Sequence, residues 1–289
     1  MTDREPDQKK EKSEVKTFTV PFPLKEFNES FSISNNENTQ LSQANILNQA
    51  FKFHSEGNIS KAVRYYQYFI NQGFKDHRVF SNYGTILKDL GKLQEAELLQ
   101  RKAIKISPDY FDAHYNLGNI LNNLGKLQEA ELSTRKAIEI KPDFATAHLN
   151  LGNILNDLNK LKEAELSTRK AIEINPDFAM AHSNLGSILN ALGEKKGAEI
   201  STRKAIELKP DYAIAHSNLG SILQDLDQLK EAELSTRKAI ELKPDYAISH
   251  SNLGSILQEL GQLKEAELST RKAIELKPTF ADAHSNLGK

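Results

Sequence analysis

The sequence of 289 residues contains no cysteine and no tryptophan. Without thiols, the chain has no disulfide, no thiolate nucleophile and no cysteine-ligated zinc or iron–sulfur centre. An excess of one charge is also missing, because 38 Lys and Arg residues balance 39 Asp and Glu residues to a net charge of −1. Nucleic-acid binders and polybasic membrane tails need a basic surplus, so the composition argues against both kinds of partner.

Long apolar stretches are absent as well. No run approaches the roughly 18 apolar residues of a membrane-spanning helix. The first sixteen residues, MTDREPDQKKEKSEVK, are charged and have no apolar core of the kind that a secretory signal requires. We therefore expect a soluble, cytoplasmic protein with no membrane association.

What the sequence has instead is an internal repeat of 34 residues. Each repeat carries a Leu-Gly pair near its start and ends shortly after a proline. The pairs begin at Leu117, Leu151, Leu185, Leu219, Leu253 and Leu287. The prolines are Pro108, Pro142, Pro176, Pro210, Pro244 and Pro278. This register divides the chain into a tail, 1–42, seven repeats over 43–280, the first of them degenerate, and an incomplete eighth repeat, 281–289.

Each repeat is predicted to form two helices. In repeat 111–144, apolar residues spaced by three and four predict a first helix over 111–124 and a second over 127–140. Only Gly, Asn or Asp occupies the fifteenth place, between them, as expected where a helix ends with positive φ. The aspartates that follow the prolines, such as Asp109, are predicted N-caps. Glu131, Arg135 and Glu139 are spaced for weak i,i+4 pairs on a solvated face.

The pattern resembles the tetratricopeptide repeat, on the strength of Leu117, Gly118, Ala130, Ala137 and Pro142 and their equivalents. The resemblance covers 43–289 and implies an all-α, right-handed superhelical solenoid whose first helices line a concave groove. Three places depart from the family pattern. The aromatic residues usual at the fourth and eleventh places are replaced by histidine and leucine, and the large residue usual at the twenty-fourth is threonine. These departures predict less aromatic packing between the helices.

The sixth place of every repeat from 77 onward is asparagine. This place lies inside the first helix, where asparagine has a low helix propensity. The row consists of Asn82, Asn116, Asn150, Asn184, Asn218, Asn252 and Asn286. A primary amide both donates and accepts, so a periodic row could hold the backbone of an extended peptide. The row is similar to the asparagine ladder of the O-linked N-acetylglucosamine transferase type of repeat. The alternatives are hydrogen bonds within each repeat, or passive inheritance through recent duplication.

Other places predicted to face the groove are polar, amide-rich and mildly acidic. The candidates are Asn119 and Asn153 at the ninth place, and Asp157 and Asp225 at the thirteenth. No catalytic residue, metal site or cofactor is predicted. Histidines that recur every 34 residues are separated by about 10 Å, the distance between packed helices, whereas zinc ligands lie near 2 Å from one ion.

The tail differs in kind, because 1–16 is charged and 28–42 is rich in Asn, Ser and Thr, which predicts disorder. Between them, at 17–24, Phe18, Val20, Phe22 and Leu24 alternate around two prolines. This segment is either a short docking element or a linker.

Repeat 179–212 is expected to be the least stable junction of the array. Lys195 replaces a leucine and Gly197 a glutamate there.

The sequence thus predicts a non-catalytic scaffold that binds proteins or peptides. The alternative is the substrate-recruiting N-terminal region of a larger enzyme of glycosyltransferase, sulfotransferase or oxygenase type, cut off at Lys289. End-to-end self-association of the array is a third possibility.

Overall fold

The computed structural model describes residues 42–287, and every regular element among them is an α-helix. The predicted all-α class is therefore confirmed. The chain divides into two compact units, an N-terminal unit up to Leu124 and a C-terminal unit from Gly125 onward, which we describe separately. The tail and the 17–24 segment lie outside the described residues, so the expectations for them stay predictions. No helix in 42–287 is long and apolar enough to cross a membrane.

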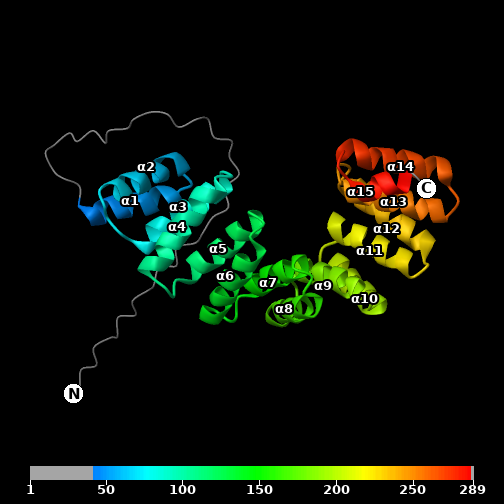
Figure 1. The fold of residues 1–289 in the computed structure, drawn as a ribbon, viewed down its shortest axis with the longest axis horizontal. Helices are drawn as coiled ribbons and strands as arrows, with labels where there is room; N and C mark the ends of the chain where they lie inside the picture. The colour runs from blue at the N-terminus through cyan, green and yellow to red at the C-terminus, as the bar shows by residue number, and fades with distance from the viewer. Residues whose placement is uncertain (1–41, 288–289) are drawn as a thin grey trace, which may run out of the picture. The chain divides into compact units, whose positions relative to one another are not determined.

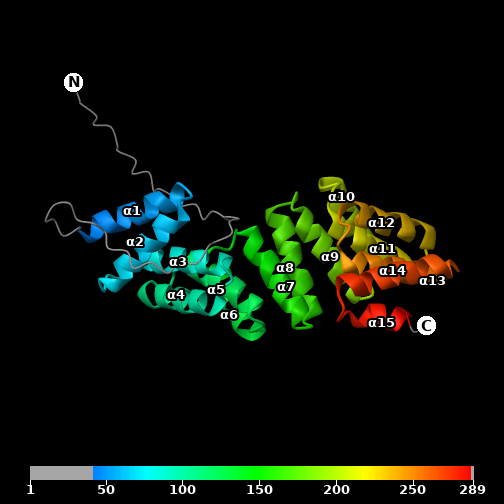
Figure 2. The same ribbon diagram turned by 90° about the horizontal axis from the view of Figure 1, so that it is seen from above.

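The helices follow one another in pairs along both units (Figure 1). Those of the N-terminal unit are α1 (Gln43–Ser55), α2 (Ile59–Asn71), α3 (His77–Asp89), α4 (Leu93–Ile106) and α5 (Phe111–Asn123). Those of the C-terminal unit are α6 (Leu127–Ile140), α7 (Ala145–Asp157), α8 (Leu161–Ile174), α9 (Ala179–Ala191), α10 (Lys195–Leu208), α11 (Ala213–Asp225), α12 (Leu229–Leu242), α13 (Ala247–Glu259), α14 (Leu263–Leu276) and α15 (Ala281–Leu287). Paired helices such as α7 and α8 lie alongside each other in both views (Figures 1 and 2).

The turn between paired helices has the predicted backbone. Every residue at the fifteenth place from Gly57 to Gly261 has a positive φ, including Asn159 at 58° and Asp227 at 60°. The N-cap prediction was wrong. The cap of α5 is Tyr110, and aromatic residues hold the same position in α7, α9, α11 and α13, with no side-chain cap hydrogen bond. The aspartate is two residues before the first helical residue, too early to cap it.

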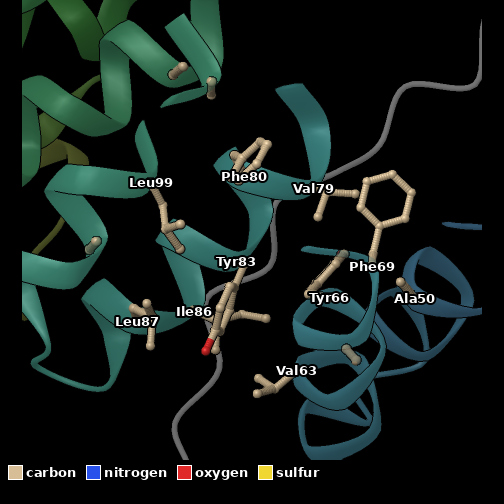
Figure 3. Close-up of a cluster of buried hydrophobic side chains, with 14 of the residues drawn as sticks. Ala50, Val63, Tyr66, Phe69, Val79, Phe80, Tyr83, Ile86, Leu87 and Leu99 are labelled. Carbon is tan, nitrogen blue, oxygen red and sulfur yellow. The ribbon is translucent and has the colours of Figure 1, made fainter. Parts of the chain in front are cut away.

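The core of the N-terminal unit is aromatic. Tyr66 and Phe69 are fully buried, and the Tyr66 ring stacks on that of Tyr83 with centroids 6.2 Å apart (Figure 3). Bulky aromatic residues thus fill the degenerate first repeat. Phe69 also meets Phe74 edge-on, with centroids 5.3 Å apart.

The C-terminal unit has a smaller, aliphatic core that continues from one repeat to the next. Leu219, Leu223 and Ala232 of repeat 213–246 pack with Ile256 of the following repeat. Equivalent residues form the same cluster one and two repeats earlier. Each repeat therefore completes the core of its neighbour, as stacking in a solenoid requires.

Glycine at the eighth place lets the paired helices approach closely. A Cβ on Gly186 or Gly220 would overlap the Oγ1 of Thr202 or Thr236 on the partner helix. The threonine hydroxyl at the twenty-fourth place is fully buried and donates to the carbonyl four residues earlier, at 2.8 Å for Thr202. Threonine therefore fits where the family usually has a larger residue, because its hydroxyl is satisfied within its own helix.

Ion pairs join the second helices of neighbouring repeats. Arg135 pairs with Glu131 as predicted, but its Nη2 also lies 2.6 Å from Glu163 of the next repeat. Glu139 pairs with Lys136 rather than with Arg135. The link between repeats recurs at Arg203–Glu231 and Arg237–Glu265. It is missing after Arg169, because the residue 28 positions later is Gly197.

The junction predicted to be least stable is partly compensated. The Nζ of Lys195 donates to the carbonyl of Asp225 in the next repeat at 2.6 Å. Lys162 reaches forward to Glu194 at 3.0 Å. The loss of the leucine is therefore offset by polar contacts that the sequence did not reveal, whereas the loss of the glutamate is not.

We predict that Gly197→Glu stabilises the chain. A Cβ at Gly197 meets only Leu189 Cδ1 at 3.4 Å, an ordinary contact, so the substitution fits. The gain should be about 0.5–1 kcal/mol in helix propensity and about 0.2–1 kcal/mol from a restored pair with Arg169. Chemical denaturation measures the total. Gly197→Ala isolates the gain from helix propensity. Arg169→Gln should remove the gain from the ion pair in the Gly197→Glu variant, where that pair exists, and should have no such effect in the wild-type chain.

In the wild-type chain, backbone amides of 194–204 should exchange with solvent before those of 160–170 and 228–238. Simultaneous exchange of the three segments would contradict a local defect.

We also predict that Ser249→Ala stabilises the chain. Ser249 is fully buried, and its hydroxyl has no hydrogen-bond partner among the described residues. Alanine stands at this place in the neighbouring repeats, as at Ala215 and Ala283. Removing an unsatisfied buried hydroxyl should raise the free energy of unfolding by about 1 kcal/mol.

The matched control is Ser183→Ala. Ser183 is equally buried, but its hydroxyl accepts a hydrogen bond from Asn218 at 3.2 Å. Its removal should lower the free energy of unfolding by about 1 kcal/mol. Shifts of the same sign in both variants, measured by thermal unfolding, would refute this account of Ser249.

Candidate functional site

The asparagine row, defined as the asparagines at the sixth place of each repeat, lies on the first helices. Its members differ in exposure. Asn82 and Asn116 of the N-terminal unit are buried, at 4% and 6% exposed. The five members in the C-terminal unit, Asn150, Asn184, Asn218, Asn252 and Asn286, are half-buried. Only this latter part of the row presents its amides to solvent.

The amides of the row reach back to the preceding repeat. Asn116 Nδ2 donates to Thr85 Oγ1 at 3.1 Å, and Asn184 Nδ2 donates to Asn153 Oδ1 at 2.6 Å. Asn218 Nδ2 donates to the hydroxyl of Ser183 at 3.2 Å. Asn252 and Asn286 make longer contacts of the same kind, at 3.5 Å, to Ser217 and Ser251. The row therefore connects successive first helices. None of the three interpretations from the sequence predicted this role.

These hydrogen bonds use only part of the hydrogen-bonding capacity of each amide. A primary amide has two N–H donors and a carbonyl with two lone pairs. The hydrogen bond from Nδ2 of Asn218 or Asn252 uses one N–H. Since both side chains are half-exposed, the second N–H and the carbonyl remain available to a ligand. The same side chain can thus hold the array together and bind.

The other predicted residues are arranged around this row. Asn153 is half-buried and accepts from Asn184, whereas Asn119 is half-buried and Asp157 is exposed. Asp225 is exposed, and its Oδ2 accepts from Asn190 of the preceding repeat at 2.8 Å. The structure therefore brings Asn153 into contact with the row and ties Asp225 to a neighbour instead.

Two features of this face were not predicted: the contacts between repeats made at the twelfth place, which was itself expected to face the groove, and the apolar residues at the second place. At the twelfth place, Gln224 donates to Ser255 at 2.8 Å and to Glu259, both in the next repeat. At the second place, one turn before the row, Met180, Ile214 and Ile248 are 47%, 36% and 41% exposed. The signal was available, because the same kind of residue recurs in three consecutive repeats.

The histidines at the fourth place bind backbone. In each case Nε2 lies 2.7–2.9 Å from the carbonyl oxygen of the proline six residues earlier, from His114 with Pro108 to His284 with Pro278. Because a carbonyl only accepts, Nε2 must carry the proton. Among residues 42–287, no three His, Asp or Glu side chains gather as metal ligands would. The histidines therefore connect each repeat to the preceding one through a hydrogen bond to its proline carbonyl.

Family models described as tetratricopeptide repeat match residues 111–144, 145–178, 181–212, 213–246 and 236–267, and one described as TPR repeat matches 84–125. Together they cover more than half of the chain. The chain belongs to the tetratricopeptide-repeat family. No curated protein sequence matches it significantly.

Solved structures agree on the fold. A tetratricopeptide-repeat protein from Parabacteroides merdae has a TM-score of 0.69 at 17% identity, over 85% of this chain and 97% of its own. PilF of Pseudomonas aeruginosa has a TM-score of 0.62 at 18% identity, over 72% of this chain and 95% of its own. A chain of the APC/C hetero-tetramer Cut9–Hcn1 has a TM-score of 0.70 at 14% identity, over 88% of this chain and 49% of its own.

The helix pair α1–α2, in the repeat called degenerate from its sequence, contains a buried chain of polar side chains that ends at Asn82 of the asparagine row. His54 Nδ1 lies 2.9 Å from Tyr66 Oη, and Tyr66 is also hydrogen-bonded to Asn82. Burial lowers the pKa of His54 below its ordinary value, against an opposing attraction from Asp89. Burial also raises the pKa of Tyr66. Both groups are therefore neutral at pH 7, as desolvation demands.

We predict that acid loosens the first repeat through His54. The unfolded chain binds a proton near the ordinary histidine pKa of 6.5, while the folded chain binds it only at lower pH. Stability is therefore lost as pH falls below 6.5 and continues to fall toward the folded pKa. Hydrogen exchange of 46–66, corrected for intrinsic rates, should show earlier opening at pH 5.5 than at pH 7. His54→Gln should remove most of this difference; an unchanged difference would assign it to other groups.

Proposed function

We propose that the chain is a non-catalytic scaffold whose C-terminal unit binds an extended protein segment along the asparagine row. The observation that carries the proposal is the recurrence of a half-buried primary amide at one place in five consecutive first helices. Membership of the tetratricopeptide-repeat family supports a scaffold that binds proteins or peptides. The near-neutral charge of −1 supports a protein ligand over a nucleic acid or a membrane.

The spacing favours an extended ligand. Adjacent packed helices lie about 8–10 Å apart, and an extended chain advances about 10 Å in three residues. One asparagine would therefore meet every third peptide unit of the ligand. Because peptide N–H and C=O groups are present whatever the side chains, such a row binds backbone with little sequence preference.

The residues beside the row set the remaining preference. Met180, Ile214 and Ile248 offer apolar contacts one turn away on one side. The exposed carboxylates of Asp157, Asp225 and Glu259 lie at the other end of the first helices. We expect a ligand with apolar side chains toward the first edge and neutral or basic ones toward the second.

The resemblance to repeats of the O-linked N-acetylglucosamine transferase type leads to the same site. If the repeats recruit substrates for an enzyme domain joined beyond Lys289, they still require a face that accepts varied segments. The full coding sequence distinguishes that alternative from a free scaffold. In both cases we place the protein in the cytoplasm, and end-to-end association of arrays is a secondary possibility.

We predict that changing Asn184, Asn218 and Asn252 together to alanine weakens ligand binding at least tenfold. Each lost ligand hydrogen bond is worth about 0.5–1.5 kcal/mol. The same variant should also unfold more easily, because each asparagine donates to the preceding repeat. The measurement is the affinity for segments selected from a random peptide library on the wild-type protein, at a temperature where both proteins are folded by circular dichroism.

A matched variant separates binding from stability. Ser183→Ala with Ser217→Ala removes the acceptors of Asn218 and Asn252 but leaves all three amides in place. It should lose stability and keep its affinity. Equal losses of affinity in both variants would make the row purely structural, and unchanged affinity in the asparagine variant would exclude it as the site.

A further inference from the structure

A row of exposed apolar side chains runs along the second helices, away from the asparagine row. At the twenty-second place, six consecutive repeats carry leucine or isoleucine with most of its surface in solvent. They are Leu98 at 61%, Leu132 at 69%, Leu166 at 69%, Ile200 at 71%, Leu234 at 69% and Leu268 at 68% exposed. Single exposed leucines need no explanation, but a periodic row of five in the C-terminal unit, from Leu132 to Leu268, indicates an interaction surface.

Within the last three complete repeats, each of these residues has an unpaired lysine one helical turn earlier. Lys196, Lys230 and Lys264 are exposed, and no ion pair joins them to another residue within 125–287. The repeats before them differ. The corresponding residue is Gln128 in one, and in the other it is Lys162, which pairs with Glu165 and Glu194.

The three lysine–apolar pairs lie side by side. Arg203 of α10 pairs with Glu231 of α12 at 2.7 Å, and Arg237 of α12 pairs with Glu265 of α14 at 2.6 Å. Each of these arginines is three residues after the apolar residue of its helix, and each glutamate is three residues before that of the next. The ion pairs therefore link the three helices in register.

We propose that this surface, formed by α10, α12 and α14, docks an acidic amphipathic helix of a partner protein. A helix lying across the three second helices returns the same face to them every seven residues, or about 10.5 Å. An apolar residue at every seventh position would meet Ile200, Leu234 and Leu268. Carboxylates along one edge of that helix would meet Lys196, Lys230 and Lys264. The site is separate from the asparagine row and does not depend on its function.

Charge on the far side of the row disfavours the other occupants. Lys204, Lys238 and Lys272 lie one turn beyond the apolar residues, and they pair with Glu207, Glu241 and Glu275, which are 67–69% exposed. Because these pairs are neutral, the free positive charge is confined to the single line of Lys196, Lys230 and Lys264, which fits one edge of an acidic helix better than an extended anionic lipid surface. A second copy of the chain would place lysine against lysine where its second helices run parallel to these, and against the neutral pairs where they run antiparallel.

The test uses a fluorescent 21-residue alanine-based peptide with leucine at every seventh position and glutamate four residues after each leucine. The full chain should bind it with an affinity that falls as salt rises. Lys196→Gln, Lys230→Gln and Lys264→Gln together should weaken binding at least fivefold. Ile200→Ser, Leu234→Ser and Leu268→Ser together should weaken it at least tenfold. All six side chains are exposed, so both variants should keep the wild-type circular dichroism.

The chain provides its own control. Leu98→Ser, Leu132→Ser and Leu166→Ser remove equally exposed apolar residues and should leave the affinity unchanged. The same peptide with lysine in place of glutamate should not bind. The proposal is overturned if the lysine variant binds the acidic peptide as tightly as the wild type, or if the control triple loses as much affinity as the test triple. It is also overturned if sedimentation shows dimers that the Ile200, Leu234 and Leu268 variant lacks, or if phosphatidylserine vesicles bind this surface while the peptide does not.

Discussion

The close approach of the two helices within each repeat is the contact on which the other features depend. Glycine at the eighth place faces threonine at the twenty-fourth, and a Cβ on Gly152, Gly186, Gly220 or Gly254 would overlap the threonine hydroxyl. The hydroxyl is satisfied by its own helix, so neither partner needs an outside group. Small residues make this contact, and the leucines beside it, such as Leu219 and Leu223, pack both within their own repeat and against Ile256 of the next.

The junctions between repeats are polar as well as apolar. Leucine and isoleucine clusters pass from one repeat to the next, but histidine-to-proline carbonyl bonds, asparagine-to-serine bonds and arginine–glutamate pairs cross the same junctions. Each is modest on its own, and exposed ion pairs contribute about 0.2–1 kcal/mol. In a linear array, stability is close to a sum over neighbours, so these small terms repeat and accumulate. The asparagine row is thus both part of the junction and part of the proposed site, and a ligand that competes for its amides would act on the coupling between repeats.

The sequence determined the fold more fully than it determined the site. The 34-residue period, the turn residues and the apolar spacing gave helices that agree with α5 and α6 to within a residue at each end. A period, however, does not show which neighbour a polar side chain will contact. Asn218 donates to Ser183 of the preceding repeat rather than within its own repeat. Arg135 pairs with Glu131 as expected, but its further partner is Glu163 of the next repeat rather than Glu139. Those contacts depend on the packing angle between repeats, which no spacing along the chain encodes.

Departures from the repeat are informative because the repeats are otherwise so alike. In repeat 179–212 the glutamate at the nineteenth place is replaced by Gly197, which leaves Arg169 without its forward partner and α10 without an acidic residue in its first turn. The row of unpaired lysines begins at the neighbouring residue, Lys196, and continues through Lys230 and Lys264. The ion-pair network of the second helices therefore changes character at one repeat. Before it, the eighteenth place is neutral or paired; from it onward, the lysine at that place is unpaired and lies beside an exposed apolar side chain. The apolar residue at the twenty-second place is exposed both before and after this change. The apolar row and the free cations therefore occur together only in the last three complete repeats, which is the combination that a surface for an acidic partner requires.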